Sequence, residues 1–137
     1  MSDLVRISMS LDNSLLEGFD AYVRSQGYPT RSEAIKALMR QSLSEQAWTH
    51  NQLVAGSITL VYDHHRQGIV KRLTDVQHDF GAVIVSTQHV HLDHHHCLEV
   101  LVVKGRAAVI QKFADALIAT KGVKHGRLTI TTPATGL

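Results

Sequence analysis

The chain contains few cysteine, proline and aromatic residues. Its 137 residues include one cysteine, two prolines and 5% aromatic side chains. A single cysteine cannot form an internal disulfide, which fits a reducing compartment, and the low proline content excludes a proline-rich linker. No apolar run approaches the roughly 18 residues that a membrane span needs, and the N-terminus lacks a basic-then-apolar signal pattern. These absences predict a soluble, cytoplasmic protein with no membrane partner.

The chain also lacks a strong net charge. With histidine neutral its formal charge is +2, and residues 1–46 carry five basic against six acidic side chains. An overall electrostatic attraction to nucleic acid therefore cannot be claimed, and any such contact would need a local face. Histidine, by contrast, is abundant, because ten are present and six of them lie between His78 and His96.

Residues 1–46 have the pattern of a strand followed by two helices. Apolar and polar residues alternate strictly over Val5–Leu11, which predicts a half-buried strand. Its polar face consists of Arg6, Ser8 and Ser10. Capping side chains at Asp12–Ser14 and at Thr30–Glu33 open two helices. Because a lone strand has no pairing partner and so short a unit buries little core, we expect this unit to pair with a second copy.

Residues 56–137 alternate strands and helices in the order β-α-β-β-α-β, and residues 47–55 read as a linker. The expected strands are Ile58–Tyr62, Ala82–His91, Cys97–Lys104 and Val123–Thr131, with helices around Ile69–Val76 and Val109–Leu117. This order is the split ferredoxin-like arrangement. The predicted fold class is therefore α+β, with a strand–helix–helix unit ahead of a ferredoxin-like domain.

The segment His89–Cys97 is the densest cluster of metal-ligating side chains. His89 and His91 lie two apart on a predicted strand, so both imidazoles project from one face. Cys97 begins the next strand across a tight turn, and His78 could supply a fourth ligand from this chain or another. Imidazole and thiolate bind nickel, copper or zinc, and a flat set of three nitrogens and one sulfur suits nickel(II) or copper(II). Because the ligands must lose protons, metal occupancy should weaken as the pH falls.

The histidines and the N-terminal strand also have interpretations that involve no metal or DNA. At least two of the histidines at 94–96 are expected to form a solvated turn, and His64 and His65 to belong to a strand-to-helix loop. The N-terminal strand can be an edge strand whose polar face meets water. Alternatively, two such strands pair antiparallel and lay their polar side chains into a major groove. The start of the second helix can hold a phosphate with its free N–H groups; the residues at its mouth are Thr30, Arg31 and Ser32.

Three segments together resemble the nickel-responsive transcriptional regulator family: VRISMSLD, TRSEAIKALMR and QHVHLDHHHC. The resemblance covers nearly the whole chain. It implies a ribbon-helix-helix DNA-binding domain at 1–46 and a ferredoxin-like, ACT-type metal-binding and tetramerisation domain at 56–137. It also implies one Ni²⁺ per subunit, and the ligands would be His89, His91, Cys97 and the opposing subunit's His78. Such proteins are homotetramers, dimers of dimers, that repress metal-uptake genes by binding a two-fold symmetric double-stranded DNA operator when metal is bound.

The same resemblance gives further residues a role. Arg6, Ser8 and Ser10 match the base-reading strand positions, although the family has threonine at the last two, so the hydroxyls are kept and the methyl groups are lost. The positions that match the surroundings of the metal, or secondary metal sites, are Tyr62, His64, Gln77 and Glu99. A further cation site in relatives uses two acidic side chains on the second helix. Glu33 matches one of them, and Ala37 stands where the other would be.

Two other functions compete with this interpretation. The first is an ACT-type transcriptional regulator that responds to an amino acid or another small organic ligand, its histidines being incidental. The second is a metal-dependent enzyme. A catalytic metal needs an open coordination position, whereas the expected ligands close a four-coordinate site. We therefore expect a metal-dependent regulator and not an enzyme.

Overall fold

The computed structural model describes residues 3–133, which form two compact units divided between Met39 and Arg40. The first two residues of the expected N-terminal domain and the last four of the C-terminal one lie outside the described residues. The N-terminal unit contains α1 (Asn13–Gln26) and the first part of α2 (Arg31–Thr49). Among the described residues, no helix is both long enough and apolar enough to cross a membrane.

Local side-chain chemistry explains where α1 and α2 begin. The Asp12 carboxylate accepts a hydrogen bond from the backbone N–H of Leu15 at 2.9 Å, and the Thr30 hydroxyl accepts one from the N–H of Glu33 at 3.1 Å. Both bonds satisfy backbone donors that a helix start otherwise leaves unpaired. At its other end α1 stops at Gly27, whose φ of 75° is left-handed. The two helices predicted for this unit are thus confirmed.

The strand expected at Val5–Leu11 is not formed in the single chain. Residues 3–12 belong to no helix or strand, and the side chains of Val5 and Ile7 are 81% and 70% exposed. The physical reason is that a strand needs the backbone of a neighbour to complete its hydrogen bonds. The alternating pattern is present, but within residues 3–133 no strand pairs with it.

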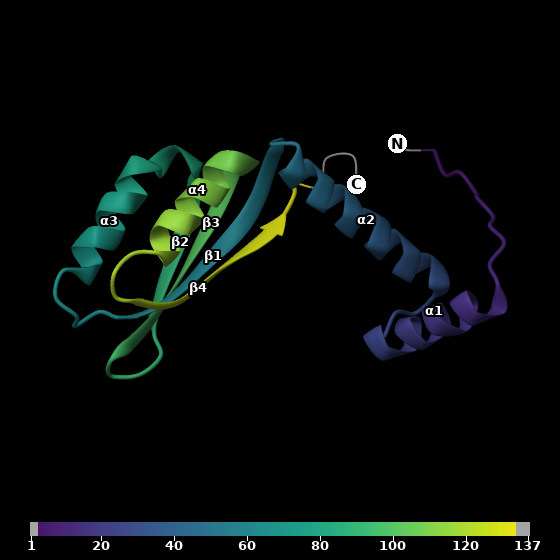
Figure 1. Cartoon of the computed structure of the whole chain (residues 1–137), viewed down its shortest axis with the longest axis horizontal. Helices are drawn as coiled ribbons and strands as arrows, with labels where there is room; N and C mark the ends of the chain where they lie inside the picture. The colour runs from purple at the N-terminus through teal and green to yellow at the C-terminus, as the bar shows by residue number, and fades with distance from the viewer. Residues whose placement is uncertain (1–2, 134–137) are drawn as a thin grey trace. The chain divides into compact units, whose positions relative to one another are not determined.

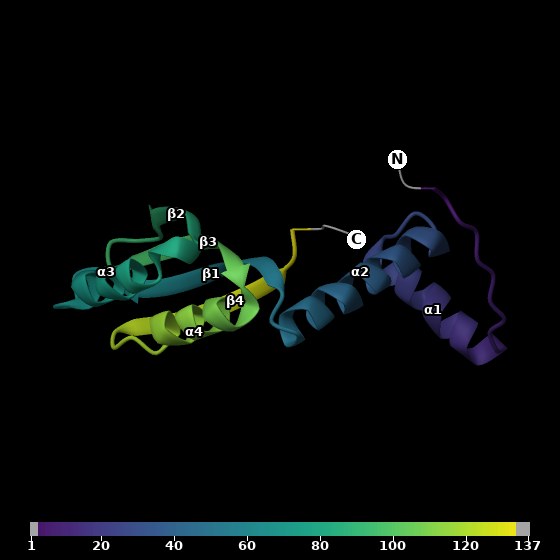
Figure 2. The same cartoon turned by 90° about the horizontal axis from the view of Figure 1, so that it is seen from above.

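The second unit is an antiparallel sheet with two helices on one face (Figures 1 and 2). The strands lie in the order β2-β3-β1-β4, all antiparallel. In chain order the elements are β1 (Leu53–Asp63), α3 (Ile69–Asp79), the short 3-10 turn η1 (Gly81–Val83), β2 (Ile84–His91), β3 (His96–Arg106), α4 (Ala107–Ile118) and β4 (Val123–Thr131). The predicted β-α-β-β-α-β order and ferredoxin-like fold are confirmed.

The core lies between the sheet and its helices. Burial alternates along β1 and β3, so that Leu101 and Val103 are buried while Val102 between them is 41% exposed. From α4, Ile110, Phe113 and Leu117 pack fully buried against this face. The sheet therefore has one face covered by helices and one that is not.

The expected linker at 47–55 is largely regular structure. Helix α2 continues to Thr49 and β1 begins at Leu53, which leaves only residues 50–52 between them. The helix extends because Ala47 and Trp48 pack against the sheet core. The indole N–H of Trp48 also donates to the backbone oxygen of Thr131 at 2.6 Å. The break between the compact units accordingly falls inside α2 and not at the predicted linker.

Candidate metal centre

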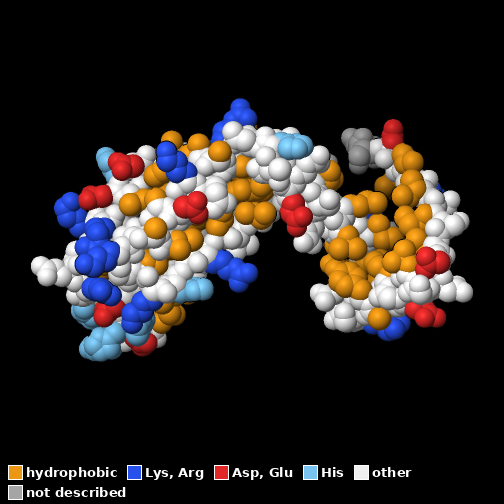
Figure 3. Space-filling view, in the orientation of Figure 1, with side chains coloured by type: hydrophobic (Ala, Val, Ile, Leu, Met, Phe, Trp, Pro, Cys, Tyr) orange, Lys and Arg blue, Asp and Glu red, His pale blue; other side chains and the backbone are white. Residues whose placement is uncertain are grey.

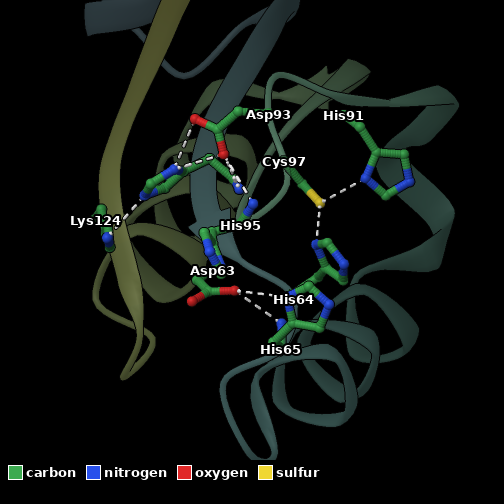
Figure 4. Close-up of polar contacts among 9 residues, drawn as sticks. Asp63, His64, His65, His91, Asp93, His95, Cys97 and Lys124 are labelled. Carbon is green, nitrogen blue, oxygen red and sulfur yellow. Dashed lines mark hydrogen bonds and ion pairs between the residues drawn. The ribbon is translucent and has the colours of Figure 1, made fainter.

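Three strands bring His64, His91 and Cys97 together at one end of the sheet. His91 ends β2 directly opposite Cys97 on β3, and on the other side of β3 Tyr62 of β1 also lies opposite Cys97, two residues before His64. The Cys97 sulfur lies 2.8 Å from Nδ1 of His64 and 3.6 Å from Nδ1 of His91 (Figure 4). One ligand atom from each residue lies within 4.8 Å of the others. A thiol and two imidazoles therefore converge on one point.

Burial favours the neutral forms of Cys97 and His64. It raises the pKa of the Cys97 thiol, whose side chain is completely buried. Burial also lowers the pKa of His64, and the neighbouring His65 and His91 add to that effect. A neutral imidazole has a lone pair available for a metal ion, whereas the thiol must release its proton before it binds one. The cluster is suited to a cation that can displace a proton from sulfur.

The donor set fits nickel. Thiolate and imidazole are the ligands that borderline transition metals prefer, and hard ions such as calcium or magnesium prefer oxygen. The three converging donors of His64, His91 and Cys97 leave room in a four-coordinate site for one more ligand. A donor from another element or another subunit would complete it.

Two of the four predicted ligands lie at this point and two do not. His89 lies on the same face of β2 as His91, with ring centroids 5.5 Å apart, but it is exposed and lies outside the convergent group. His78 is exposed at the end of α3, and within residues 3–133 it belongs to no convergent group. His64, expected only near the metal, contacts the sulfur instead. The signal that could have found it is the ferredoxin-like strand order, which places the end of the first strand beside the start of the third.

A buried hydrogen-bond network lies next to the cluster. Glu99, on the same face of β3 as Cys97, is only 8% exposed. The Tyr62 hydroxyl donates to its Oε2 and the Gln77 amide to its Oε1, both at 3.0 Å. Burial, followed by the nearby Glu99 carboxylate, raises the pKa of Tyr62. Because Gln77 precedes His78 in α3, this network connects the end of that helix to the strand that carries Cys97.

A second group of convergent ligands lies at the same end of the sheet: Asp63, His65 and His95. His65 was expected in a strand-to-helix loop and His95 among the histidines of a solvated turn, so this group was not predicted. No spacing pattern signals it, because its members come from the end of β1 and from two separate loops.

The residues expected to contact DNA are exposed, and two of them, Arg31 and Thr30, form hydrogen bonds within the chain. Arg6, Ser8 and Ser10 lie in the irregular N-terminal segment. The guanidinium of Arg31 donates two hydrogen bonds, each 2.8 Å, to the Asp20 carboxylate and so joins α2 to α1. Thr30 caps α2, and Ser32 is exposed in its first turn.

The additional cation site implied for α2 lacks one of its two acidic side chains. Glu33 forms an ion pair with Lys36 at 3.2 Å, and Ala37 supplies no second carboxylate.

Comparison with known proteins supports the assignment of a metal centre to this part of the chain. Residues 55–131 match the family model described as the NikR C terminal nickel binding domain. A nickel-responsive regulator from Syntrophus aciditrophicus is 52% identical over 130 residues, 95% of both chains. One from Solibacter usitatus is 55% identical over 133 residues, 96% of both chains. An uncharacterized protein of known structure from Thermotoga maritima covers 58% of this chain and 98% of its own at 16% identity, with a TM-score of 0.53, which shows a shared fold.

Proposed function

This chain belongs to the nickel-responsive regulator family, and we propose that it represses metal-uptake genes by binding a two-fold symmetric operator when nickel is bound. It is a nickel-dependent, DNA-binding transcriptional regulator and not an enzyme. A regulator that responds to an amino acid is not favoured. The observation that carries the proposal is the convergence of a thiol with imidazoles inside the segment that matches the nickel-binding domain.

The proposed ligands of one Ni²⁺ per subunit are His89, His91, Cys97 and the partner subunit's His78. The register supports the first three, because His91 lies opposite Cys97 and His89 projects from the same face. His78 is exposed at the end of α3, where a second copy can reach it. In this proposal His64 contacts Cys97 in the nickel-free chain and gives way to His89. Nickel, when bound, would supply a cross-link between subunits.

The proposed assembly is a homotetramer built as a dimer of dimers. Two separate apolar surfaces support it. One is the sheet face without helices, where Val90 and Val102 are 40% and 41% exposed. The other is on the N-terminal unit, where Ile7, Met9 and Leu38 are exposed. Exposed apolar surfaces of this kind mark protein interfaces, and two of them per chain allow two kinds of contact.

The domain division proposed from the sequence assigns DNA binding to residues 1–46 and metal binding and tetramerisation to 56–137. When two copies pair, their Val5–Leu11 segments would form an antiparallel ribbon. Such a ribbon fits a major groove, where Arg6 and the hydroxyls of Ser8 and Ser10 can reach base edges. Thr30, Arg31 and Ser32 at the start of α2 would face a phosphate, which the free backbone N–H groups favour. With DNA as its partner, the proposed location of the chain is the cytoplasm.

Sharing the ligands between subunits explains how nickel controls DNA binding. An effector shifts an equilibrium only as far as its affinities for the alternative states differ. A site that needs residues from two chains exists in just one arrangement of the tetramer, so it supplies such a difference. Glu99 and Gln77 would hold the end of α3, and with it His78, in position. Tyr62 would support Glu99, and Glu33 without a second carboxylate is not proposed to hold a cation.

The test compares Cys97→Ala with Arg6→Ala. An operator is first selected from a random duplex pool by the nickel-loaded protein, and its affinity is then measured with and without nickel. We expect Cys97→Ala to abolish the stimulation by nickel while the circular dichroism spectrum is unchanged. Arg6→Ala should weaken operator binding about 5- to 150-fold, equivalent to about 1–3 kcal/mol for one base contact, with nickel binding intact.

Two results would count against the proposal. One is nickel-stimulated DNA binding that persists in Cys97→Ala. The other is an equal loss of nickel and DNA binding in Arg6→Ala.

A further inference from the structure

Asp63, His65 and His95 come from the end of a strand and from two loops, and they lie beside the Cys97 centre. Asp63 ends β1, His65 lies in the connection to α3, and His95 lies in the turn between β2 and β3. One ligand atom from each lies within 4.8 Å of the other two. Figure 3 shows histidine side chains gathered at this end of the sheet unit, with acidic side chains among them.

Backbone hydrogen bonds hold both loops in shape. The Asp63 carboxylate accepts from the backbone N–H of His65 at 2.9 Å, and the Nδ1 atom of that ring lies 3.5 Å from the same oxygen (Figure 4). In the turn, Asp93 accepts from the N–H groups of His95 and His96, both at 2.8 Å. The two imidazoles are therefore presented from ordered backbone, and both are exposed.

The chemistry of this group suits a divalent cation. The His65 backbone N–H and the nearby imidazoles lower the pKa of Asp63, so its carboxylate is ionised. A carboxylate oxygen with two imidazole nitrogens is a ligand set found around zinc and related ions, with metal–ligand distances of about 2.0–2.2 Å. Because the three ligand atoms already lie within 4.8 Å of one another, small side-chain rotations would let all three reach one ion at such metal–ligand distances.

We propose that Asp63, His65 and His95 form a second divalent-metal site that contains no sulfur and fills after the Cys97 centre. The Cys97 centre fills first because its thiolate is a softer ligand and binds borderline ions more strongly than a carboxylate does. The sites are neighbours, since the rings of His64 and His65 lie 3.9 Å apart by their centroids. An ion held by the second group would join the end of β1 to the turn that precedes Cys97. The site does not depend on the proposed function.

Cobalt(II) titration of the full-length chain tests this site, because a thiolate ligand adds a charge-transfer absorption that imidazole and carboxylate do not. We expect a first ion with this band and then a second ion without it. The double variant His65→Ala, His95→Ala should bind one ion fewer per chain and keep the band. Asp63→Asn, which keeps the oxygen that accepts the His65 N–H, should weaken only the second step. His125→Ala, an exposed histidine of β4, is the matched control and should behave like the parent.

Three results would overturn this inference: unchanged stoichiometry in the double variant, loss of its charge-transfer band, or an equal loss of ions in His125→Ala. Cys97→Ala separates this proposal from the previous one. That variant should lose the band and still take up the second ion, whatever happens to its DNA binding.

Discussion

The two units of the chain differ in how much of their own core they supply. In the sheet unit, α4 alone buries Phe113, Ile110, Leu117 and two alanines. In the N-terminal unit, α1 buries nothing, and in the part of α2 that belongs to it Ala34 is the buried hydrophobic residue. Figure 3 shows apolar surface spread widely over the N-terminal unit. We therefore expect the sheet unit to fold by itself and the N-terminal unit to need a second copy, so that DNA binding would depend on assembly.

The largest expected effect is a loss of stability in the sheet unit, which supplies its own core. Phe113→Ala removes a fully buried ring that stacks on Phe80 with centroids 5.0 Å apart. We expect its free energy of unfolding to fall by about 3–5 kcal/mol, measured by urea denaturation. Val109→Ala, on the exposed side of α4, is the control and should change it little. Similar losses in both variants would show that the core has been misplaced.

The next effect tests the unit that lacks a core. Ile7→Ala removes apolar surface that is 70% exposed in the single chain and buried in the proposed ribbon. We expect a loss of about 1.5–3 kcal/mol per copy in dimerisation, measured by sedimentation of the full-length chain. Arg6→Ala, on the other face of the ribbon, should sediment like the parent. Unchanged association in Ile7→Ala would argue against the ribbon.

A smaller effect sharpens the comparison at the metal centre. Glu99→Gln removes a buried carboxylate and places an amide beside the Gln77 donor. Since partners of this kind orient metal ligands, nickel affinity should drop about 10- to 100-fold by competition with a chelator. Glu45→Gln, exposed on α2, is the matched control. Equal nickel affinity in the two variants would remove the role assigned to the network.

The smallest effect concerns the ion pair that joins α1 to α2. The Arg31 guanidinium lowers the pKa of Asp20, so the pair stabilises the fold above the ordinary pKa of an aspartate and is lost as the pH falls through the lowered value. Asp20→Asn should therefore be slightly less stable near neutral pH and equal to the parent in acid. Added salt should shrink the difference, because the pair is exposed. A difference that grows toward acid in thermal melts would reverse this assignment.

Sequence patterns predicted those helices and strands whose formation depends only on the periodicity of their own segment. Strand β4 lies at its expected bounds, Val123–Thr131, because alternation within one segment specifies it. The N-terminal strand was expected on equal grounds but needs a partner from outside the chain. The contact of His64 with Cys97 depends on the order of strands in the sheet. The group formed by Asp63, His65 and His95 depends on two turns, whose shapes come from side-chain hydrogen bonds that alternation does not encode.

The central claim is that one nickel site takes ligands from two chains, and mixing two defective chains tests it most directly. His78→Ala and Cys97→Ala should each lose tight nickel binding when assembled alone. When they are unfolded together and refolded as mixed oligomers, a pair can combine an intact His78 from one chain with an intact Cys97 from the other. We expect tight nickel binding to return in the mixture, at about half of the sites of each mixed pair. A mixture that binds nickel no better than either variant alone would contradict it.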